Sequence, residues 1–232
     1  MPPAVLTAQH VTAGYRDPVI TDVSLSVRPG QTVGLAGPSG SGKSTLARVL
    51  ALLHKPFRGV VSIDGEAVTK FRFGALQRTR IGVLFQQPRL SVDPRFTLRR
   101  AIAEPLRGNQ ERVEELADAV MLTADLLDRR PHEVSDGQLQ RACLARALAL
   151  RPRYLICDEM TTMLDASTTA ALVGVIRAYQ EETGAGVLAI SHDSTLLGRW
   201  ADETVRLQPH PVSGTGQRDL ADAPTRNSPT TS

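Results

Sequence analysis

The sequence lacks the cysteine patterns of disulfide scaffolds and zinc sites. It has two cysteines, Cys143 and Cys157, and neither belongs to a C-x-x-C motif or to a Cys/His spacing. A disulfide framework and a cysteine-based metal site are therefore excluded. Both residues stand in apolar runs, so we expect two small buried side chains, in keeping with a reducing cytosol.

Long apolar runs and blocks of one charge are also missing. No run approaches the ~18 residues that a membrane span requires, and Met1–Ala4 lacks the basic start and apolar core of a signal peptide. The charge is nearly balanced, with 27 basic and 24 acidic residues, and the basic residues are scattered. This pattern indicates no nucleic-acid partner. If the chain works at a membrane, it must dock on another chain.

The sequence does contain a glycine-rich loop of a specific type. Residues 37–45 read GPSGSGKST and match G-x-x-x-x-G-K-[ST], the phosphate-binding loop, between a strand-like run and a helical run. Backbone N–H groups of such a loop converge on an anion, and the helix dipole adds positive potential. The residues expected to hold the phosphates are Gly37, Pro38, Ser39, Gly40, Ser41, Gly42, Lys43, Ser44 and Thr45. Lys43 is expected at the β- and γ-phosphates and the Ser44 hydroxyl on Mg²⁺.

Apolar periodicity predicts the other elements of an α/β fold. Strands are expected over residues 6–11, 22–27, 32–36, 59–63, 81–85, 154–157, 186–190 and 203–207, with turns at 13–15 and 64–65. Helices are expected over residues 43–53, 98–106, 110–121, 123–128, 135–150, 167–182 and 194–200. Ser167 is a predicted N-cap, with Gly184 just past the end of the same helix. The helix over 135–150 is expected to bury one face, formed by Leu139, Cys143, Ala147 and Leu150.

The domain organisation follows from these runs. Residues 1–207 are expected to form one domain, in which about 87–150 make a helical insertion between strands of the core. From residue 208 to 232 the composition is dominated by Pro, Ser, Thr, Gly and charged residues. Such a segment cannot bury enough apolar surface to order itself, so we expect a disordered tail.

Two carboxylates follow the apolar strand over 154–157. Asp158, at the strand end, can hold Mg²⁺ directly or through water beside the phosphates. Glu159 points elsewhere and can polarise a water against the γ-phosphate as a general base. The sequence therefore predicts a nucleotide-hydrolysing site.

The order of the remaining motifs resembles the ATP-binding cassette family, the ATPase subunits of ABC transporters. These motifs are residues 134–138 (VSDGQ) directly before a helix, Asp165 after Glu159, and His192 after a strand. The resemblance covers about residues 4–207. It implies an α/β P-loop NTPase fold with a mixed core sheet, an N-terminal antiparallel β subdomain and an inserted helical subdomain.

The resemblance also implies a shared active site. In this family two cassettes sandwich two ATP molecules head to tail, and the signature of one completes the phosphate loop of the other. Tyr15 matches the residue that stacks on adenine, and Gln86 matches the glutamine that contacts Mg²⁺ or the attacking water. The signature residues are Ser135, Gly137 and Gln138.

Catalytic and metal-binding roles are carried over in the same way. Lys43, Glu159 and His192 are implied as catalytic residues, with His192 at the γ-phosphate. Ser44, Gln86 and Asp158 are implied as the Mg²⁺ site, and Asp165 closes the D-loop.

Two departures from the family pattern affect the site that this chain completes on a partner. Asp136 replaces a signature glycine, and a carboxylate near the γ-phosphate is unfavourable unless it points away. Asp also tolerates an unusual φ there better than most residues. The D-loop has Met160 where Pro is usual and Thr162–Met163 where Ser-Ala is common. We therefore hypothesise an unequal pair of ATP sites in a heterodimer.

The segments 93–98 (DPRFTL) and 102–106 (IAEPL) resemble the second ATPase subunit of oligopeptide, dipeptide and nickel importers. This implies a second ABC ATPase subunit, identical or different, two integral-membrane permease subunits and, indirectly, an extracytoplasmic solute-binding protein. The location implied is peripheral, on the cytoplasmic face of the cell membrane. The alternative is a soluble, non-transport ABC protein such as a carbon-phosphorus lyase accessory ATPase.

Overall fold

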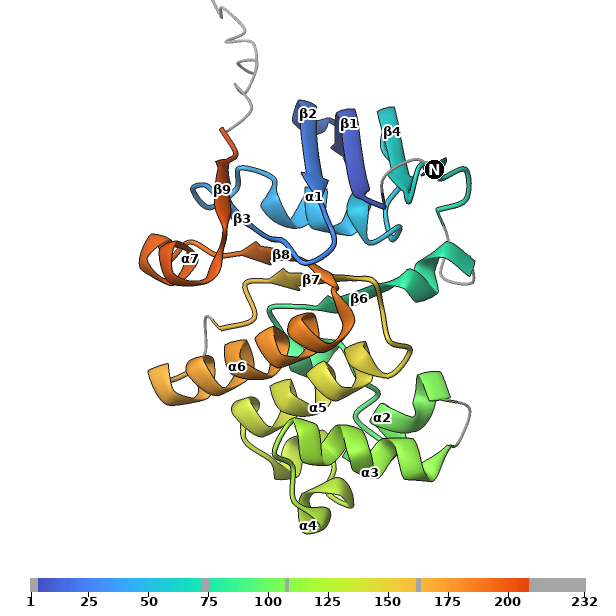
Figure 1. The fold of residues 1–232 in the computed structure, drawn as a ribbon, viewed down its shortest axis with the longest axis vertical. Coiled ribbons are helices and arrows are strands. Elements are labelled where there is room, and N and C mark those ends of the chain that lie inside the picture. Colours follow the sequence, from blue (N-terminus) through green and yellow to red (C-terminus); the bar gives the residue numbers. More distant parts are fainter. Residues whose placement is uncertain (1–3, 72–75, 107–108, 162–163, 209–232) are drawn as a thin grey trace, which may run out of the picture.

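The computed structural model describes residues 4–71, 76–106, 109–161 and 164–208, which form two sheets and a helical region (Figure 1). The first sheet is antiparallel, in the order β2-β1-β4-β5, and consists of β1 (Leu6–Gly14), β2 (Pro18–Val27), β4 (Arg58–Ile63) and β5 (Glu66–Ala67). The second is parallel, in the order β6-β7-β8-β3-β9, and consists of β6 (Ile81–Leu84), β7 (Tyr154–Asp158), β8 (Gly186–Ile190), β3 (Thr32–Ala36) and β9 (Glu203–Arg206). The expected α/β architecture with an N-terminal antiparallel sheet is confirmed, but the core sheet is parallel in all its described strands rather than mixed.

Helices cover both faces of the parallel sheet. Figure 1 shows α1 (Lys43–Leu50) between the two sheets, and α5 (Asp136–Leu148) and α6 (Ala166–Thr183) on the opposite face of the parallel sheet. Farther from the sheet lie α2 (Leu98–Ala103), α3 (Gln110–Ala119) and α4 (Ala124–Leu127). A last helix, α7 (Ser194–Trp200), precedes β9. In the described part of residues 87–150 the chain forms helices and no strand.

Alternation along the parallel strands divides the interior into two hydrophobic cores. In β7, Tyr154 and Ile156 belong to the core shared with α1 and the antiparallel sheet, whereas Leu155 and Cys157 belong to the core under α5 and α6. Successive side chains of a strand point to opposite faces, so a strand buried on both faces serves both cores. Both cysteines are buried, as predicted, and burial raises the pKa of the Cys143 thiol to about 12.

Several predicted boundaries are wrong for local reasons. The turn expected at 13–15 begins later, because Ala13 and Gly14 continue β1 and pair with β2. Helix α1 ends at Leu50 rather than Leu53, because Leu52 adopts a left-handed φ of 59°. The segment expected as one helix over 98–106 is α2 followed by a 3₁₀ turn, Glu104–Leu106.

Two predictions about helix surfaces also need correction. The N-cap of α6 is Asp165 rather than Ser167: its carboxylate accepts a hydrogen bond from the Thr168 amide at 2.8 Å, and the Ser167 hydroxyl donates to the same carboxylate. A carboxylate is favoured there by the positive end of the helix dipole. Gly184 is the left-handed C-cap, as predicted. Leu150 lies beyond the end of α5 and is exposed, so it does not share the buried face of that helix.

Some predictions fall outside the described residues. These are the tail beyond residue 208, the first three residues, and the D-loop pair Thr162–Met163. Within the described ranges, no helix is both long and apolar enough to cross a membrane.

Asp64 ties the two sheets together. It stands in the turn between β4 and β5 with a left-handed φ of 54° and is 13% exposed. It accepts hydrogen bonds from the Tyr154 hydroxyl at 2.7 Å, from Arg153 Nη1 at 2.8 Å and from Arg80 Nη1 at 3.2 Å. These donors stand at the starts of β6 and β7. One carboxylate therefore joins the antiparallel sheet to the parallel sheet.

We expect Asp64→Asn to lower the free energy of unfolding by about 1–2 kcal/mol, because charge-assisted hydrogen bonds are weakened and the two arginines are partly exposed. Asn tolerates the left-handed backbone, so the loss reports the charge. Urea unfolding followed by circular dichroism measures it. The control is Asp93→Asn, which alters an Asp–Arg pair within one short segment whose arginine is 85% exposed, so its midpoint should shift less. Equal shifts in both variants would contradict the linking role of Asp64.

Candidate functional site

The predicted phosphate loop, Asp158, Glu159 and His192 come together at one edge of the parallel sheet. β3 ends at Ala36, before the phosphate loop; β7 ends at Asp158; and β8 ends at Ile190, before Ser191 and His192. Asp158 pairs with Ile190, and Ile190 pairs with Leu35. All these strands are parallel, so their carboxyl ends meet at the same edge. This edge is where open α/β sheets bind ligands.

The phosphate loop leads into α1 with an uncapped helix start. Gly42 is the N-cap with a φ of 93°, no side chain caps the helix, and its first turn holds no acidic residue. A Cβ added to Gly42 would lie 2.3 Å from Ile20 Cγ2, so a larger residue does not fit. The first amides of α1 are therefore available to an anion, which the helix dipole favours. Thr45 packs inward and is buried.

Lys43 is a buried cation at the centre of this loop. Its side chain is 5% exposed, and Nζ donates to the carbonyl oxygens of Gly37 at 2.9 Å and Pro38 at 3.0 Å. Nζ also lies 3.5 Å from Glu159 Oε1. Among the described residues, the buried hydroxyl of Ser41 in the same loop has no hydrogen-bond partner. Unpaired buried polar groups are costly, and a polar ligand atom would relieve that cost.

Asp158 and Ser44 meet across the sheet edge. Asp158 follows Tyr154 and Ile156 at two-residue spacing and so points to the same face as α1. The Ser44 hydroxyl donates to Asp158 Oδ1 at 3.1 Å. Burial raises the pKa of the Asp158 carboxyl, and the hydrogen bond from Ser44 opposes that rise. Gln86 lines the same cavity as Ser44 and Asp158. Hydroxyl, carboxylate and amide oxygens form a donor set that fits Mg²⁺.

Glu159 is held in an unusual backbone conformation. Its φ is 48°, and its amide donates to the Ile190 carbonyl at 3.0 Å. The side chain lies between Lys43 and His192, with Oε2 4.0 Å from the His192 Nδ1. Non-glycine residues with such φ values cost free energy and cluster at functional sites. His192 is 60% exposed and so faces the open side of the site.

Tyr15 has two supporting residues that the sequence did not reveal. It lies in the β1–β2 loop and is 63% exposed. Arg48 of α1 donates to the Tyr15 hydroxyl at 2.7 Å, and the centroids of the His54 and Tyr15 rings are 5.1 Å apart. The sequence held one signal that could have pointed to Arg48: this residue lies on the helix that follows the phosphate loop, one turn beyond Ser44. The structure thus orients the ring that the family resemblance assigns to adenine.

The signature residues are not joined to the phosphate loop of the same chain. Ser135 and Gln138 form a capping box at the start of α5, with bonds of 2.9 and 3.2 Å. A Cβ added to Gly137 would lie 3.1 Å from Thr168 Cγ2, at the start of α6. Among the described residues, no hydrogen bond or ion pair links these three residues to residues 37–45.

Asp136 differs from expectation in its backbone. It is the first residue of α5, and its φ is not among the positive values of the described residues. The unusual φ considered for this position is therefore absent. In the D-loop, Met160 is buried, and Asp165 serves as the α6 cap.

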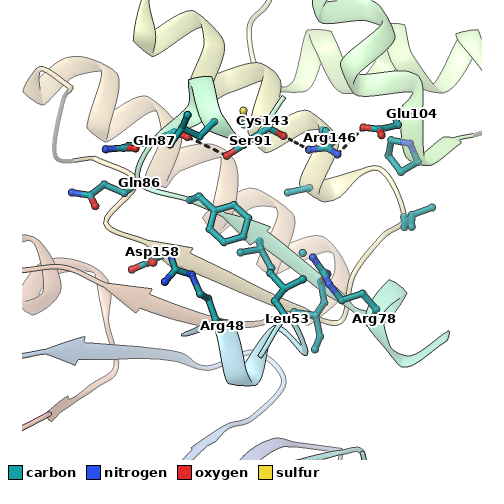
Figure 2. A pocket seen from close by; sticks show the side chains of 18 of the residues that line it. Arg48, Leu53, Arg78, Gln86, Gln87, Ser91, Glu104, Cys143, Arg146 and Asp158 are labelled. Carbon is teal, nitrogen blue, oxygen red and sulfur yellow. Dashed lines mark hydrogen bonds and ion pairs between the residues drawn. The ribbon is translucent and has the colours of Figure 1, made fainter. Parts of the chain in front are cut away.

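A cavity of about 920 Å³ extends from Ser44 and Asp158 toward the helical region. Figure 2 shows Gln86 and Asp158 at one part of it, and Arg146 and Glu104 at another. Arg146 donates to the Ser91 carbonyl at 2.8 Å and to Glu104 at 2.6 Å. The exposed side chains of Leu53, Leu90 and Leu150 also line it. The site therefore opens into a partly apolar groove.

Comparisons with known proteins show what this chain is similar to. Residues 20–162 match the family model described as ABC transporter. The nickel import ATP-binding protein NikE of Brucella suis biovar 1 (strain 1330) is 38% identical over 201 residues, which cover 82% of this chain and 76% of that protein. The dimeric structure of MJ0796, described as a bacterial ABC transporter cassette, superposes with a TM-score of 0.79 at 28% identity, covering 88% of this chain and 94% of that one. The post-hydrolysis state of MJ0796 bound to ADP and Pi gives 0.78 at 28% identity, covering 88% and 96%.

Burial of Asp158 should make the stability of the fold depend on pH. Because folding raises the pKa of this carboxyl, the fold loses stability as pH rises from the unfolded-state pKa through the higher folded-state pKa, where the charged form is disfavoured. We expect Asp158→Asn to raise the melting temperature in the absence of Mg²⁺ and nucleotide. The gain should grow as pH rises through the carboxyl's titration range and vanish at acid pH, where the group is protonated in both states.

Ser44→Ala is the opposing variant, because it removes the hydroxyl that favours the charged carboxylate. We expect its melting temperature to fall at neutral pH. Differential scanning fluorimetry across pH measures both variants. A lower melting temperature for Asp158→Asn would show that the carboxylate stabilises the unliganded fold.

Proposed function

The chain belongs to the ABC transporter family and is an ATPase of that family, and from this premise we propose that it powers an importer of nickel or a related small solute such as a peptide. The geometry that supports hydrolysis is the meeting of the phosphate loop with Asp158, Glu159 and His192 at one sheet edge. The likeness to a protein named for nickel import supports the solute.

Different residues of this chain have different roles in ATP hydrolysis. When ATP binds, the Lys43 ammonium leaves the carbonyl oxygens of Gly37 and Pro38 and contacts the β- and γ-phosphates. The amides at the start of α1 hold the same phosphates. Glu159 accepts a proton from the attacking water, and His192 contacts the γ-phosphate. The 3.5 Å contact between Lys43 and Glu159 is consistent with both acting on one phosphate.

Ser44, Asp158 and Gln86 would hold Mg²⁺ in this proposal. The Ser44–Asp158 hydrogen bond places two oxygen ligands together, and Gln86 lines the same cavity. A bound Mg²⁺ supplies positive charge to the phosphate oxygens. It would also compensate for burying the Asp158 carboxylate.

A second cassette completes the site. Ser135, Gly137 and Gln138 lie at the start of α5, where Gly137 faces Thr168 of α6, and among the described residues none of the three is hydrogen-bonded to the phosphate loop of this chain. We assign them to the ATP bound by the partner cassette, which is either a second copy of this chain or a different ABC ATPase. Closure then depends on γ-phosphate contacts that favour the closed pair over the open one.

The groove that begins at Gln86 supports docking of a permease. Leu90 is 83% exposed at its rim, and three arginines, Arg48, Arg78 and Arg146, also line it. An amphipathic helical segment of an integral-membrane subunit matches this mixture of apolar and charged groups. Peripheral attachment at the cytoplasmic face, two permease subunits and an extracytoplasmic solute-binding protein complete the proposed importer.

The first test is Glu159→Gln in the assembled complex. Removal of the general base should reduce ATP hydrolysis about 10²-fold or more while ATP binding is retained. The bound ATP should then stabilise the cassette dimer, which size-exclusion chromatography and phosphate release together measure. Lys43→Ala is the contrasting variant, because it should lose binding as well. Wild-type turnover of Glu159→Gln would remove Glu159 from catalysis.

The second test concerns the groove and the transported solute. A tagged chain purified from its own membranes should bring integral-membrane subunits with it, and Leu90→Asp should reduce their recovery because it places a charge on the apolar rim. Met121→Asp is the matched control, since Met121 is an exposed apolar residue outside the groove.

The same strains report transport. Uptake of radioactive nickel should fall in the Leu90→Asp strain and remain normal in the Met121→Asp strain. Recovery of phosphonate-degrading enzymes in place of membrane subunits would favour the carbon-phosphorus lyase alternative. Normal nickel uptake with reduced dipeptide uptake would reassign the solute.

A further inference from the structure

One arginine connects the segment after Gln86 to the altered signature. Arg89 lies in a 3₁₀ turn, Pro88–Leu90, and its Nη2 is 2.8 Å from Oδ1 of Asp136. Asp136 is the residue that replaces the usual signature glycine. The two residues are 47 positions apart in the sequence, so only the packing of the helical region brings them together.

The same guanidinium also holds the loop that precedes the signature. Arg89 Nη1 donates to the Pro131 carbonyl at 2.7 Å, and Nη2 donates to the Val134 carbonyl at 3.3 Å. Arg89 therefore contacts three points in the stretch 131–136: it donates hydrogen bonds to two carbonyls and forms an ion pair with the Asp136 carboxylate, whose Oδ1 accepts no hydrogen bond among the described residues. A planar guanidinium holds its donors in a fixed fork and so suits several separate partners, whereas the three donors of an ammonium radiate from one nitrogen.

We infer that Arg89 is a positioning residue for the signature, which it orients toward the ATP bound by the partner cassette. It neutralises the Asp136 carboxylate and keeps it turned toward the segment after Gln86. This inference rests on the proposed function, in which the signature faces a partner's ATP. One consequence is that the aspartate in the signature does not by itself disable the ATP site of the partner cassette that the signature faces.

The contact is better suited to positioning than to stability. Both side chains are about half exposed, at 48% for Arg89 and 40% for Asp136, and such ion pairs contribute little to the free energy of unfolding. An uncompensated carboxylate near a triphosphate, by contrast, repels it directly. Kinetics should therefore detect the loss of Arg89 more clearly than thermal unfolding does.

The test is a double-mutant cycle in the assembled complex, with Mg-ATP as the substrate. Arg89→Ala should raise the KM for ATP about five- to tenfold with a smaller change in kcat, because it leaves Asp136 unpaired. Adding Asp136→Gly to Arg89→Ala should restore most of the affinity. Arg89→Lys should give partial rescue, since it keeps the charge but loses the forked contacts.

Arg95→Ala is the matched control. Arg95 forms an exposed pair with Asp93 in the same segment and makes no described contact with the signature, so its KM should equal that of the wild type. The inference is overturned if Arg89→Ala also keeps the wild-type KM. It is likewise overturned if adding Asp136→Gly to Arg89→Ala fails to restore the KM.

A second measurement separates this inference from the proposed function. Hydrogen–deuterium exchange of the full chain alone should be faster over residues 131–138 in Arg89→Ala and unchanged in Arg95→Ala. Unchanged exchange in Arg89→Ala overturns the positioning role even if the complex hydrolyses ATP. A wild-type complex that does not hydrolyse ATP overturns the proposed function, and the assignment of the signature to a partner's ATP falls with it.

Discussion

The alternation of side chains across the parallel sheet is the constraint on which the nucleotide site depends. In β7 this alternation sends Tyr154 and Ile156 toward α1 and Cys157 toward α5 and α6. Asp158 continues the first series, so its carboxylate reaches the Ser44 hydroxyl at the start of α1. A register shift of one residue would turn the carboxylate toward the other core. The two cores therefore fix the direction of the carboxylate as well as the stability of the sheet.

The nucleotide site contains several groups in costly arrangements. Lys43 is buried against two carbonyl oxygens, Asp158 is buried with a raised pKa, and Glu159 has a left-handed φ. A phosphate chain and a divalent cation would relieve the first two costs, because they supply the opposite charge to each group. The strain at the site is thus consistent with a fold whose stability rises when ligand binds.

The signature carries a different electrostatic arrangement from the one that its sequence suggests. Taken alone, Asp136 argues for a weakened site on the partner cassette, because it adds a negative charge beside a triphosphate. In the fold the carboxylate faces Arg89, and the backbone at Asp136 is ordinary helix. With its charge paired, Asp136 gives no reason to expect unequal ATP sites, and the departure that remains is Met160 in the D-loop.

Local features could be predicted from the residues alone: the phosphate loop, the strand over 32–36, the order of the motifs and hence the family. These depend on residues close together in the chain. Prediction from the residues failed where neighbouring residues compete for one role: the N-cap of α6 is Asp165 rather than Ser167. Only the tertiary structure paired Arg48 with Tyr15, and Arg89 with Asp136. Such contacts join residues more than thirty positions apart, and their geometry exists only once the sheets and helices have packed.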